Sequence, residues 1–176
     1  MKEHKILFTG TMGAGKTTAI SVVSDTAPVV TDVLNTDPTL IKEKTTVGFD
    51  YGELQLASGE RLRLYGTPGQ QRFAFMWQIL ATGALGLVII IDNSRPQPLT
   101  DLSIYLENFA ALIRDTGCVI GVGRMDSHQQ PDLDDYARHL HEQGIICPVI
   151  AVDVREREQV LMLIDLLLMQ LENRMP

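Results

Sequence analysis

The residues whose types and spacing most clearly specify chemistry lie at positions 10–17, where the sequence GTMGAGKT fits the phosphate-binding pattern G-x-x-x-x-G-K-[S/T]. Glycines in such a loop let successive backbone N–H groups turn inward around a phosphate, and the following helix adds partial positive charge at its N-terminus. Lys16 can neutralise the β- and γ-phosphate oxygens, and the Thr17 hydroxyl can bind Mg²⁺. The pattern predicts a nucleotide site formed by Gly10, Thr11, Met12, Gly13, Ala14, Gly15, Lys16, Thr17 and Thr18.

A phosphate loop of this kind must follow a strand and open a helix, and the surrounding sequence meets this requirement. Apolar, β-rich runs alternate with segments of helical period, which is typical of an α/β domain with a mainly parallel sheet. We expect strands at residues 4–9, 47–57, 61–65, 85–92, 118–123 and 145–152. We expect helices after Gly15 and at residues 100–114, 131–144 and 156–173.

The second and third expected strands are joined by residues 57–60, too short a link for a crossover helix, so they must form an antiparallel hairpin. Within the first of these strands the apolar alternation changes phase at Gly52 and Glu53, which predicts a β-bulge. The stretch between Asp25 and Thr45 shows no clear period and is expected to be a long functional loop. The expected fold is a three-layer α/β P-loop NTPase fold with a six-stranded, mostly parallel sheet, one antiparallel edge hairpin and helices on both faces.

The composition indicates one domain spanning residues 1–176, because 45% hydrophobic residues in a chain of this length can form one sizeable core. The net charge of −7 is spread over interspersed acids and bases, so we expect no binding to nucleic acid. The longest apolar run, residues 85–91, is too short to cross a bilayer, and neither a signal peptide nor a lipidation motif is recognisable. We therefore expect a cytoplasmic protein without a direct membrane anchor.

Residues 10–18, 45–54, 66–73 and 123–126 fall in the order and spacing of the Ras-like small GTPases, and nearly the whole chain can be laid onto that pattern. The chain looks most like the prokaryotic members, the broad group that includes the MglA-type polarity GTPases and those encoded beside roadblock-domain proteins. Its switch I segment resembles the Arf-like form. The resemblance implies a single small GTPase domain that binds GTP or GDP together with Mg²⁺.

The two switch segments carry the residues that the resemblance implies are catalytic. Thr46 stands at the end of switch I, where a threonine reaches Mg²⁺ and the γ-phosphate. Gly69 and Gln70 match switch II, in which the glycine amide senses the γ-phosphate and the glutamine orients the attacking water. Gly66 stands where the family has a metal-supporting aspartate, which predicts weakened Mg²⁺ binding rather than loss of nucleotide binding. The implied catalytic residues are Gln70, Lys16 and Thr46, and the implied metal ligands are Thr17 and Thr46.

The base-reading segment is implied at residues 123–126, where the family has N-K-x-D. The Asp126 carboxylate can accept from the guanine ring N–H and amino group, whereas adenine would leave it unpaired. Arg124 can cover the base with its aliphatic stem and planar guanidinium, while Gly123 lacks the contacts of the asparagine. Val154 stands where a backbone N–H meets the guanine carbonyl, although an ordinary turn capped by Asp153 fits the same residues.

The resemblance implies a GTP-binding molecular switch that hydrolyses GTP slowly. The sequence has no arginine between Thr17 and Glu60 that could act as a finger in cis, so acceleration requires a partner. Met12 either projects toward the γ-phosphate and obstructs that region or bends aside.

A protein effector or regulator, such as a roadblock-domain protein, is the expected partner. It is expected to bind the switch regions around Thr46 and residues 69–77, where aromatic and methionine side chains follow Gln70. Arg72 and Trp77 are the expected surface residues.

Two other functions fit the same sequence. Gly66, Gly123 and Met12 are consistent with a hydrolysis-deficient nucleotide-binding scaffold, a pseudo-GTPase. The altered base motif is consistent with a P-loop ATP-dependent phosphotransferase, which would need clustered arginines at a second substrate site.

Overall fold

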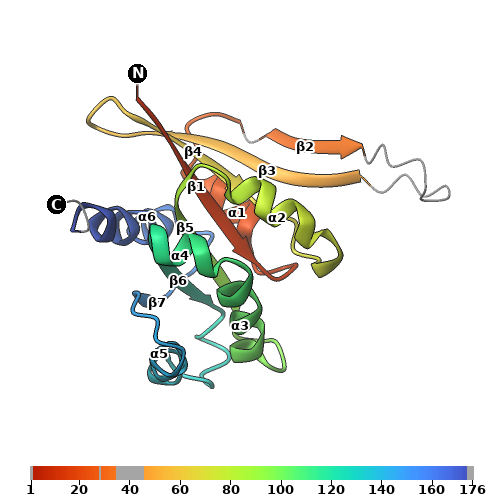
Figure 1. The fold of residues 1–176 in the computed structure, drawn as a ribbon, viewed down its shortest axis with the longest axis vertical. Helices are drawn as coiled ribbons and strands as arrows, with labels where there is room; N and C mark the ends of the chain where they lie inside the picture. The colour runs from red at the N-terminus through yellow and green to blue at the C-terminus, as the bar shows by residue number, and fades with distance from the viewer. Residues whose placement is uncertain (1, 28, 35–45, 174–176) are drawn as a thin grey trace.

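The computed structural model describes residues 2–27, 29–34 and 46–173, and for residues 30–34 and 46–48 it describes the backbone alone. Within these ranges a seven-stranded sheet runs in the order β2-β3-β4-β1-β5-β6-β7 and carries helices on both faces (Figure 1). The strands are β1 (Glu3–Gly10), β2 (Val29–Leu34), β3 (Thr46–Gln55), β4 (Arg61–Gly66), β5 (Ala84–Asp92), β6 (Cys118–Gly123) and β7 (Val149–Ala151). The helices are α1 (Lys16–Val23), α2 (Ala74–Ala81), α3 (Pro98–Asn108), α4 (Ala110–Asp115), α5 (Leu133–Glu142) and α6 (Arg157–Glu172), with the 3₁₀ turn η1 (Gln71–Phe73) before α2.

Strands β4, β1, β5, β6 and β7 pair in parallel, and β3 pairs antiparallel with β4 through the predicted hairpin. The predicted three-layer α/β fold is therefore confirmed. Because the carboxyl ends of parallel strands meet at one edge of a sheet, the loops that follow β1, β4, β5, β6 and β7 gather there.

Two apolar layers hold the helices on the sheet, one on each face. The first lies under α1 and α6 and includes Ile6, Phe8, Ile20, Leu62, Leu64, Val88, Ile90, Leu163 and Leu167. The second lies under α2, α3, α4 and α5 and includes Leu7, Trp77, Leu87, Ile89, Ile91, Leu106, Phe109 and Tyr136. Adjacent residues of β1 and β5 thus face different layers, which explains why these central strands are continuous apolar runs.

The sheet has a seventh strand that the sequence analysis assigned to a long loop. Strand β2 pairs antiparallel with β3, from Val29 opposite Tyr51 to Leu34 opposite Thr46. Its sequence VVTDVL is rich in β-branched residues, which favour strands, and this signal was outweighed by the aperiodic stretch around it. The remainder of that stretch, residues 35–45, lies outside the described residues.

The predicted β-bulge at Gly52 and Glu53 is wrong. The pairing of β3 with β4 runs without a register shift from Asp50 opposite Gly66 to Gln55 opposite Arg61. The apolar phase changes because β3 contributes to both layers: Phe49 packs on one face, and Leu54 packs on the other. The apolar side chains change from one face of β3 to the other, and in the sequence this change has the same pattern as the extra residue of a β-bulge.

Two other expected elements differ in length. The expected helix at 100–114 is two helices, α3 and α4, that meet at Phe109, whose φ of −108° and ψ of 17° depart from helical values. The expected strand at 145–152 contributes only Val149–Ala151, because Pro148 before it has no N–H to donate to a neighbouring strand. Among the helices of the described ranges, none is both long and apolar enough to cross a bilayer.

Trp77, expected at the surface, is fully buried instead. Its ring lies 5.1 Å from that of Tyr105 and 5.9 Å from that of Phe109, and its Nε1–H donates to the carbonyl of Pro68 over 2.8 Å. The exposed apolar side chains of this helix are Phe75 and Ile79. Trp77 therefore connects the loop after β4 to the core.

Replacing Trp77 with alanine should lower the free energy of unfolding by about 3–5 kcal/mol, because it removes a fully buried aromatic ring and leaves a cavity. Phe75→Ala, at a side chain that is 56% exposed, is the matched control and should change it by less than about 0.5 kcal/mol. Urea denaturation of both variants measures this difference. Equal losses in the two variants would contradict the assignment of Trp77 to the core.

Candidate functional site

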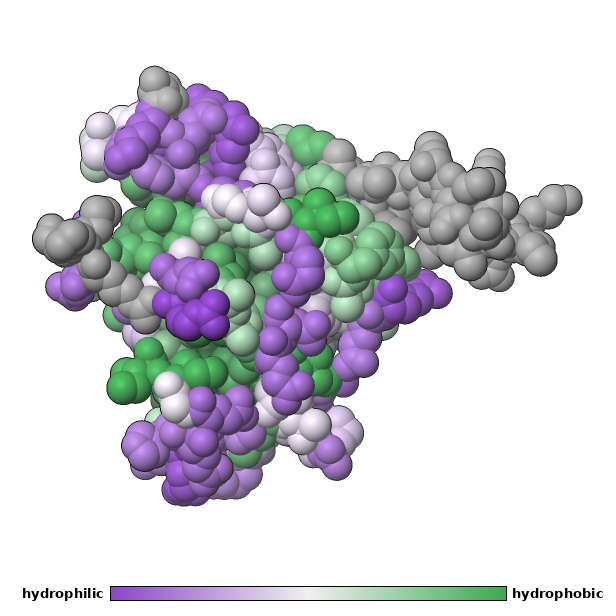
Figure 2. Space-filling view, in the orientation of Figure 1, coloured by the Kyte–Doolittle hydropathy of each residue, from purple (hydrophilic) through white to green (hydrophobic). Residues whose placement is uncertain are grey.

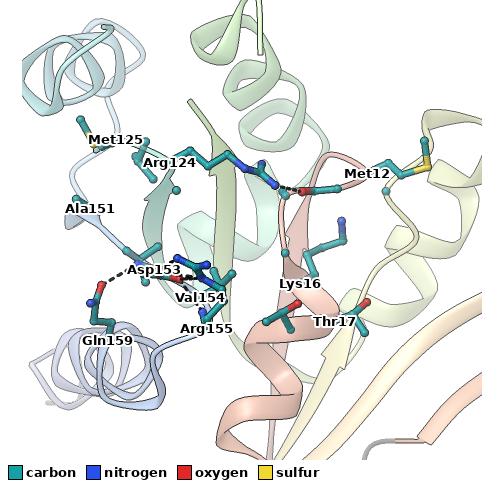
Figure 3. A pocket seen from close by; sticks show the side chains of 18 of the residues that line it. Met12, Lys16, Thr17, Arg124, Met125, Ala151, Asp153, Val154, Arg155 and Gln159 are labelled. Atoms are coloured by element: carbon teal, nitrogen blue, oxygen red, sulfur yellow. Dashed lines mark hydrogen bonds and ion pairs between the residues drawn. The ribbon is translucent and has the colours of Figure 1, made fainter. Parts of the chain in front are cut away.

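A cleft of about 1000 Å³ lies at the edge of the sheet where the parallel strands end (Figure 3). Its lining combines residues 12–18, 50, 67–69, 122–127, 151–155 and 159. The structure thus brings together the predicted phosphate loop, the switch II glycine and the predicted base-reading segment. Gly10 and Thr11 belong to the phosphate loop behind this lining, and Gln70 directly follows it. Of the predicted residues, only the side chain of Thr46 lies outside what the structure describes.

The phosphate loop needs glycine at both of its ends. Gly10 has a φ of +147°, and a Cβ there would lie 2.1 Å from the carbonyl oxygen of Ile90 on the neighbouring strand. Gly15, which caps α1, has a φ of +103°, and a Cβ there would lie 2.6 Å from a methyl group of Val154. These two close approaches fix the loop against β5 on one side and against the loop after β7 on the other.

The Lys16 ammonium group lies inside the loop. Its Nζ donates to the carbonyl oxygens of Gly10 over 2.7 Å and of Thr11 over 2.9 Å. Burial lowers the pKa of Lys16 to about 8, and the negative charge of Asp50 partly offsets this effect. The loop therefore holds a cation whose protonation changes near neutral pH.

Asp50, on β3, is a site residue that the sequence analysis missed. The Thr17 hydroxyl donates to Asp50 Oδ2 over 2.7 Å. Asp50 is the cross-strand partner of Gly66, and a Cβ at Gly66 would lie 3.0 Å from Asp50 Oδ2. The carboxylate expected at position 66 is thus supplied from the adjacent strand, in space that the glycine leaves open.

The register of the predicted hairpin contained the signal that could have identified Asp50. Gln55 pairs with Arg61, and counting five residues outward on each strand places Asp50 opposite Gly66. Side chains of paired residues project to the same face of a sheet and lie within contact distance. A carboxylate opposite the position where one is missing was therefore visible in the sequence.

These oxygen groups fit a magnesium ion. Mg²⁺ prefers hard oxygen ligands and is usually held by one or two protein groups together with substrate phosphates. The Thr17 hydroxyl and the Asp50 carboxylate meet this requirement at the wall of the cleft. Within the described part of the chain, no three His, Cys, Asp or Glu side chains form a group that could hold a metal on their own.

Gly69, which the sequence predicts to be the glycine of switch II, lies directly against the phosphate loop. A Cβ at Gly69 would lie 2.5 Å from the backbone nitrogen of Met12 and 3.0 Å from Lys16 Nζ. The next residue, Gln70, donates from Nε2 to the sulfur of Met12 over 3.4 Å. Met12 points its side chain away from the cleft (Figure 3) and is exposed, so it contacts the predicted catalytic glutamine rather than filling the cleft.

At the other end of the cleft, Asp126 and Val154 both line the wall as expected. The backbone N–H of Asp153 donates to Gln159 Oε1 over 2.7 Å, and that of Arg155 donates to Asp153 Oδ1 over 3.0 Å. In the described structure the N–H of Val154 between them has no such partner. The turn thus leaves one donor available beside the cleft.

Arg124 is placed differently from the expectation that its guanidinium covers the base. The group forms an ion pair with Asp92 at the end of β5, and it donates to the carbonyl of Gly13 over 3.2 Å (Figure 3). Burial acts to raise the pKa of Asp92, but hydrogen bonds from Ser94 and Arg124 outweigh it, so this pKa lies below its ordinary value. The guanidinium nitrogens are thus engaged by the protein, while the half-exposed side chain of Arg124 still lines the cleft.

A glycine-bounded loop between a strand and a helix, with a lysine inside it, defines a P-loop nucleotide-binding protein of the α/β class. Comparison with known sequences agrees with this class. The chain belongs to the family described as conserved hypothetical ATP binding protein, whose model matches residues 40–144, more than half of the chain.

Two curated relatives are similar to this chain. An uncharacterized protein of Methanocaldococcus jannaschii, MJ1339, is 28% identical over 93 residues, which are 53% of this chain and 53% of that protein. The match therefore spans about half the length of that relative. The Ras-related protein RabC of Dictyostelium discoideum is 23% identical over 180 residues, covering 98% of this chain and 85% of RabC.

The lowered pKa of Lys16 predicts a pH dependence of nucleotide binding. Since the ammonium form attracts phosphate and the neutral form does not, the affinity for a nucleoside triphosphate should fall as the pH rises through about 8. Lys16→Arg keeps its charge and should show a flat profile over the same range. Fluorescent nucleotide titrations between about pH 7 and 9.5 measure both profiles. A wild-type affinity that stays constant across this range would contradict the role of Lys16.

Proposed function

We propose that this protein is a GTP-binding molecular switch that hydrolyses GTP slowly and signals to a protein partner. The observation that carries the proposal is the position of Gly69, where a Cβ would lie 2.5 Å from the backbone nitrogen of Met12 and 3.0 Å from Lys16 Nζ, so that only a glycine fits this close to the phosphate loop. A γ-phosphate held by Lys16 occupies the neighbourhood of this glycine. Binding of a triphosphate and movement of the 67–70 loop are therefore coupled by sterics, which is the physical requirement of a switch.

Each residue of the cleft has a separate role in nucleotide binding or in hydrolysis. The amides of residues 13–18 and the Lys16 ammonium group hold the phosphates, and the Asp126 carboxylate pairs with the guanine edge. The Gln70 amide gives up its hydrogen bond to the Met12 sulfur and then orients the attacking water. Thr46 is expected to approach the γ-phosphate from the end of β3. Thr17 and Asp50 would hold Mg²⁺ together with the phosphate oxygens, and the ion would supply positive charge that offsets the charge of the phosphates.

A partner surface adjoins the switch. Phe75 and Ile79 are one helical turn apart on α2 and are 56% and 61% exposed, and Figure 2 shows hydrophobic surface over this helix. Arg72, also exposed, lies over the ring of Phe73 beside them. Trp77 links this helix to Pro68, so movement of the 67–70 loop reaches the exposed side chains. A protein effector or regulator, such as a roadblock-domain protein, would read the nucleotide state here.

A second candidate is an adenine-nucleotide-binding protein, which the description of the family favours. The arginines that line the cleft do not support a phosphotransferase, because Arg124 is paired with Asp92 and Arg155 with Asp153. Both guanidinium groups therefore already have a carboxylate partner within the protein.

Titration with GTP, GDP and ATP, followed by single-turnover hydrolysis, tests these functions. We expect GTP to bind at least about tenfold more tightly than ATP, and Asp126→Ala to remove most of this preference because it removes the acceptor for the guanine edge. Asp134→Ala, on the exposed side of α5, is the control and should bind as the wild type does. ATP binding as tight as GTP binding would refute the switch. Tight GTP binding without turnover, unaffected by Gln70→Ala, would favour the hydrolysis-deficient scaffold.

Moving the carboxylate between strands tests the role of Asp50. Asp50→Asn should raise the Mg²⁺ concentration needed for half-maximal GTP binding by about tenfold, because it removes a charged oxygen beside Thr17. The double replacement Asp50→Gly and Gly66→Asp returns a carboxylate to the same region and removes the crowding from Asp50, leaving the terminal methyl group of Ile20 to shift slightly, and should restore most of the Mg²⁺ response. Magnesium titrations of GTP binding give the comparison. An unchanged response in Asp50→Asn would show that this carboxylate does not support the metal.

A further inference from the structure

The base-reading loop, residues 124–131, is held by the end of β5. Gly123 ends β6, and its cross-strand partner on β5 is Asp92. A Cβ at Gly123 would meet its nearest atom at 3.6 Å, so the glycine is not required by crowding. The side chains that fix the loop are therefore supplied by the neighbouring strand rather than by residue 123.

Asp92 connects the loop to the phosphate loop through Arg124. Asp92 is 8% exposed, and its carboxylate forms an ion pair with one terminal nitrogen of the Arg124 guanidinium. The other terminal nitrogen donates to the carbonyl of Gly13. Arg124 has a φ of +61°, a left-handed conformation that is uncommon for a residue other than glycine. The two contacts of its guanidinium stabilise this conformation and set the direction in which the loop leaves β6.

Asn93 holds the opposite end of the same loop. Its side chain is buried and donates from Nδ2 to the carbonyls of His128 over 2.6 Å and Pro131 over 3.1 Å. Its Oδ1 accepts from the Tyr136 hydroxyl over 2.7 Å, and its backbone N–H donates to the carbonyl of Gly123 over 3.1 Å. Every polar group of this amide side chain is thus satisfied by the loop or by α5.

We propose that Asp92 and Asn93 are positioning residues for base recognition, which hold loop 124–131 so that Asp126 faces the base. This inference rests on the proposed function, because it assigns to these residues the selection of guanine. A loop that is ordered before binding costs less entropy to engage than one that must be ordered by the ligand. Loosening it should therefore weaken the nucleotide whose base Asp126 recognises and spare one that is bound through its phosphates alone.

Asp92→Asn tests the first anchor, with GDP and ADP as probes. We expect the Kd for GDP to rise about tenfold, because a charged hydrogen bond to the Arg124 guanidinium is lost, while the Kd for ADP changes less than about twofold. Asp101→Asn is the matched control: it breaks the ion pair with Arg95, which lies outside the cleft, and should leave both Kd values unchanged. Equal weakening of GDP and ADP by Asp92→Asn would overturn the inference, because a general loss of structure has that effect.

Arg124→Lys gives a second measurement at a half-exposed side chain where unfolding is not at issue. The lysine ammonium group lacks the fixed fork of the guanidinium, whose two terminal nitrogens contact Asp92 and Gly13 separately, so the Kd for GDP should rise about fivefold. The double variant Asp92→Asn/Arg124→Lys should bind GDP no more weakly than Asp92→Asn alone, since both changes break one bridge. If the increases in the Kd for GDP caused by the two single variants multiply in the double variant, Asp92 and Arg124 do not act through one bridge, and that assignment is overturned.

Asn93→Ala tests the second anchor. Like Asp92→Asn, it should raise the Kd for GDP more than the Kd for ADP. Equal Kd values for GDP and ADP in the wild type would refute the proposed function and this inference with it. A wild type that prefers GDP, with variants at Asp92 and Asn93 that keep the full preference, would refute this inference alone.

Discussion

The parallel pairing of β4, β1, β5 and β6 is the constraint on which the rest of the structure depends. Phe8 of β1 lies between Gly66 of β4 and Val88 of β5, and Asp92 lies beside Gly123. Four chain segments that are far apart in the sequence therefore leave the same edge of the sheet side by side. The phosphate loop and residues 67–69 and 122–127 line one cleft because of this pairing, and the two apolar layers keep the sheet fixed.

Pairing between neighbouring strands, antiparallel for β3 with β4 and parallel for β5 with β6, also accounts for two departures from the Ras-like pattern. Gly66 and Gly123 each stand where that pattern has a polar side chain, and each pairs across the sheet with an aspartate, Asp50 or Asp92. Paired residues on adjacent strands share a face and lie about 5 Å apart, so a carboxylate can be supplied from either strand. The two cases differ in packing, because Asp50 fills the space beside Gly66, whereas Gly123 has open space around it. When each strand is considered without its neighbour, Gly66 and Gly123 look like positions that have lost a functional side chain.

The sequence contained most of the fold and only part of the site. Central strands and amphipathic helices follow from local apolar patterns, and the short link at residues 57–60 required the β3–β4 hairpin. The phosphate loop was predictable because its chemistry lies within eight consecutive residues. Asp50 could have been found only by counting the hairpin register.

Other features depend on contacts that no local pattern encodes. The direction of the Arg124 guanidinium is set by residues from two other segments, Gly13 and Asp92. Trp77 was misplaced because α2 is apolar around most of its circumference, so the sequence did not distinguish its buried face from its exposed one.

The way in which Asn93 holds the base-reading loop has a consequence for sequence variation. Its amide binds the main-chain carbonyls of residues 128 and 131, and those groups are present whatever side chains the loop carries. The attachment therefore imposes little restriction on the residues at positions 127–130, which face outward. The rim of the cleft can change its side chains, and with them the surface offered around a bound base, while its anchoring to the sheet stays the same.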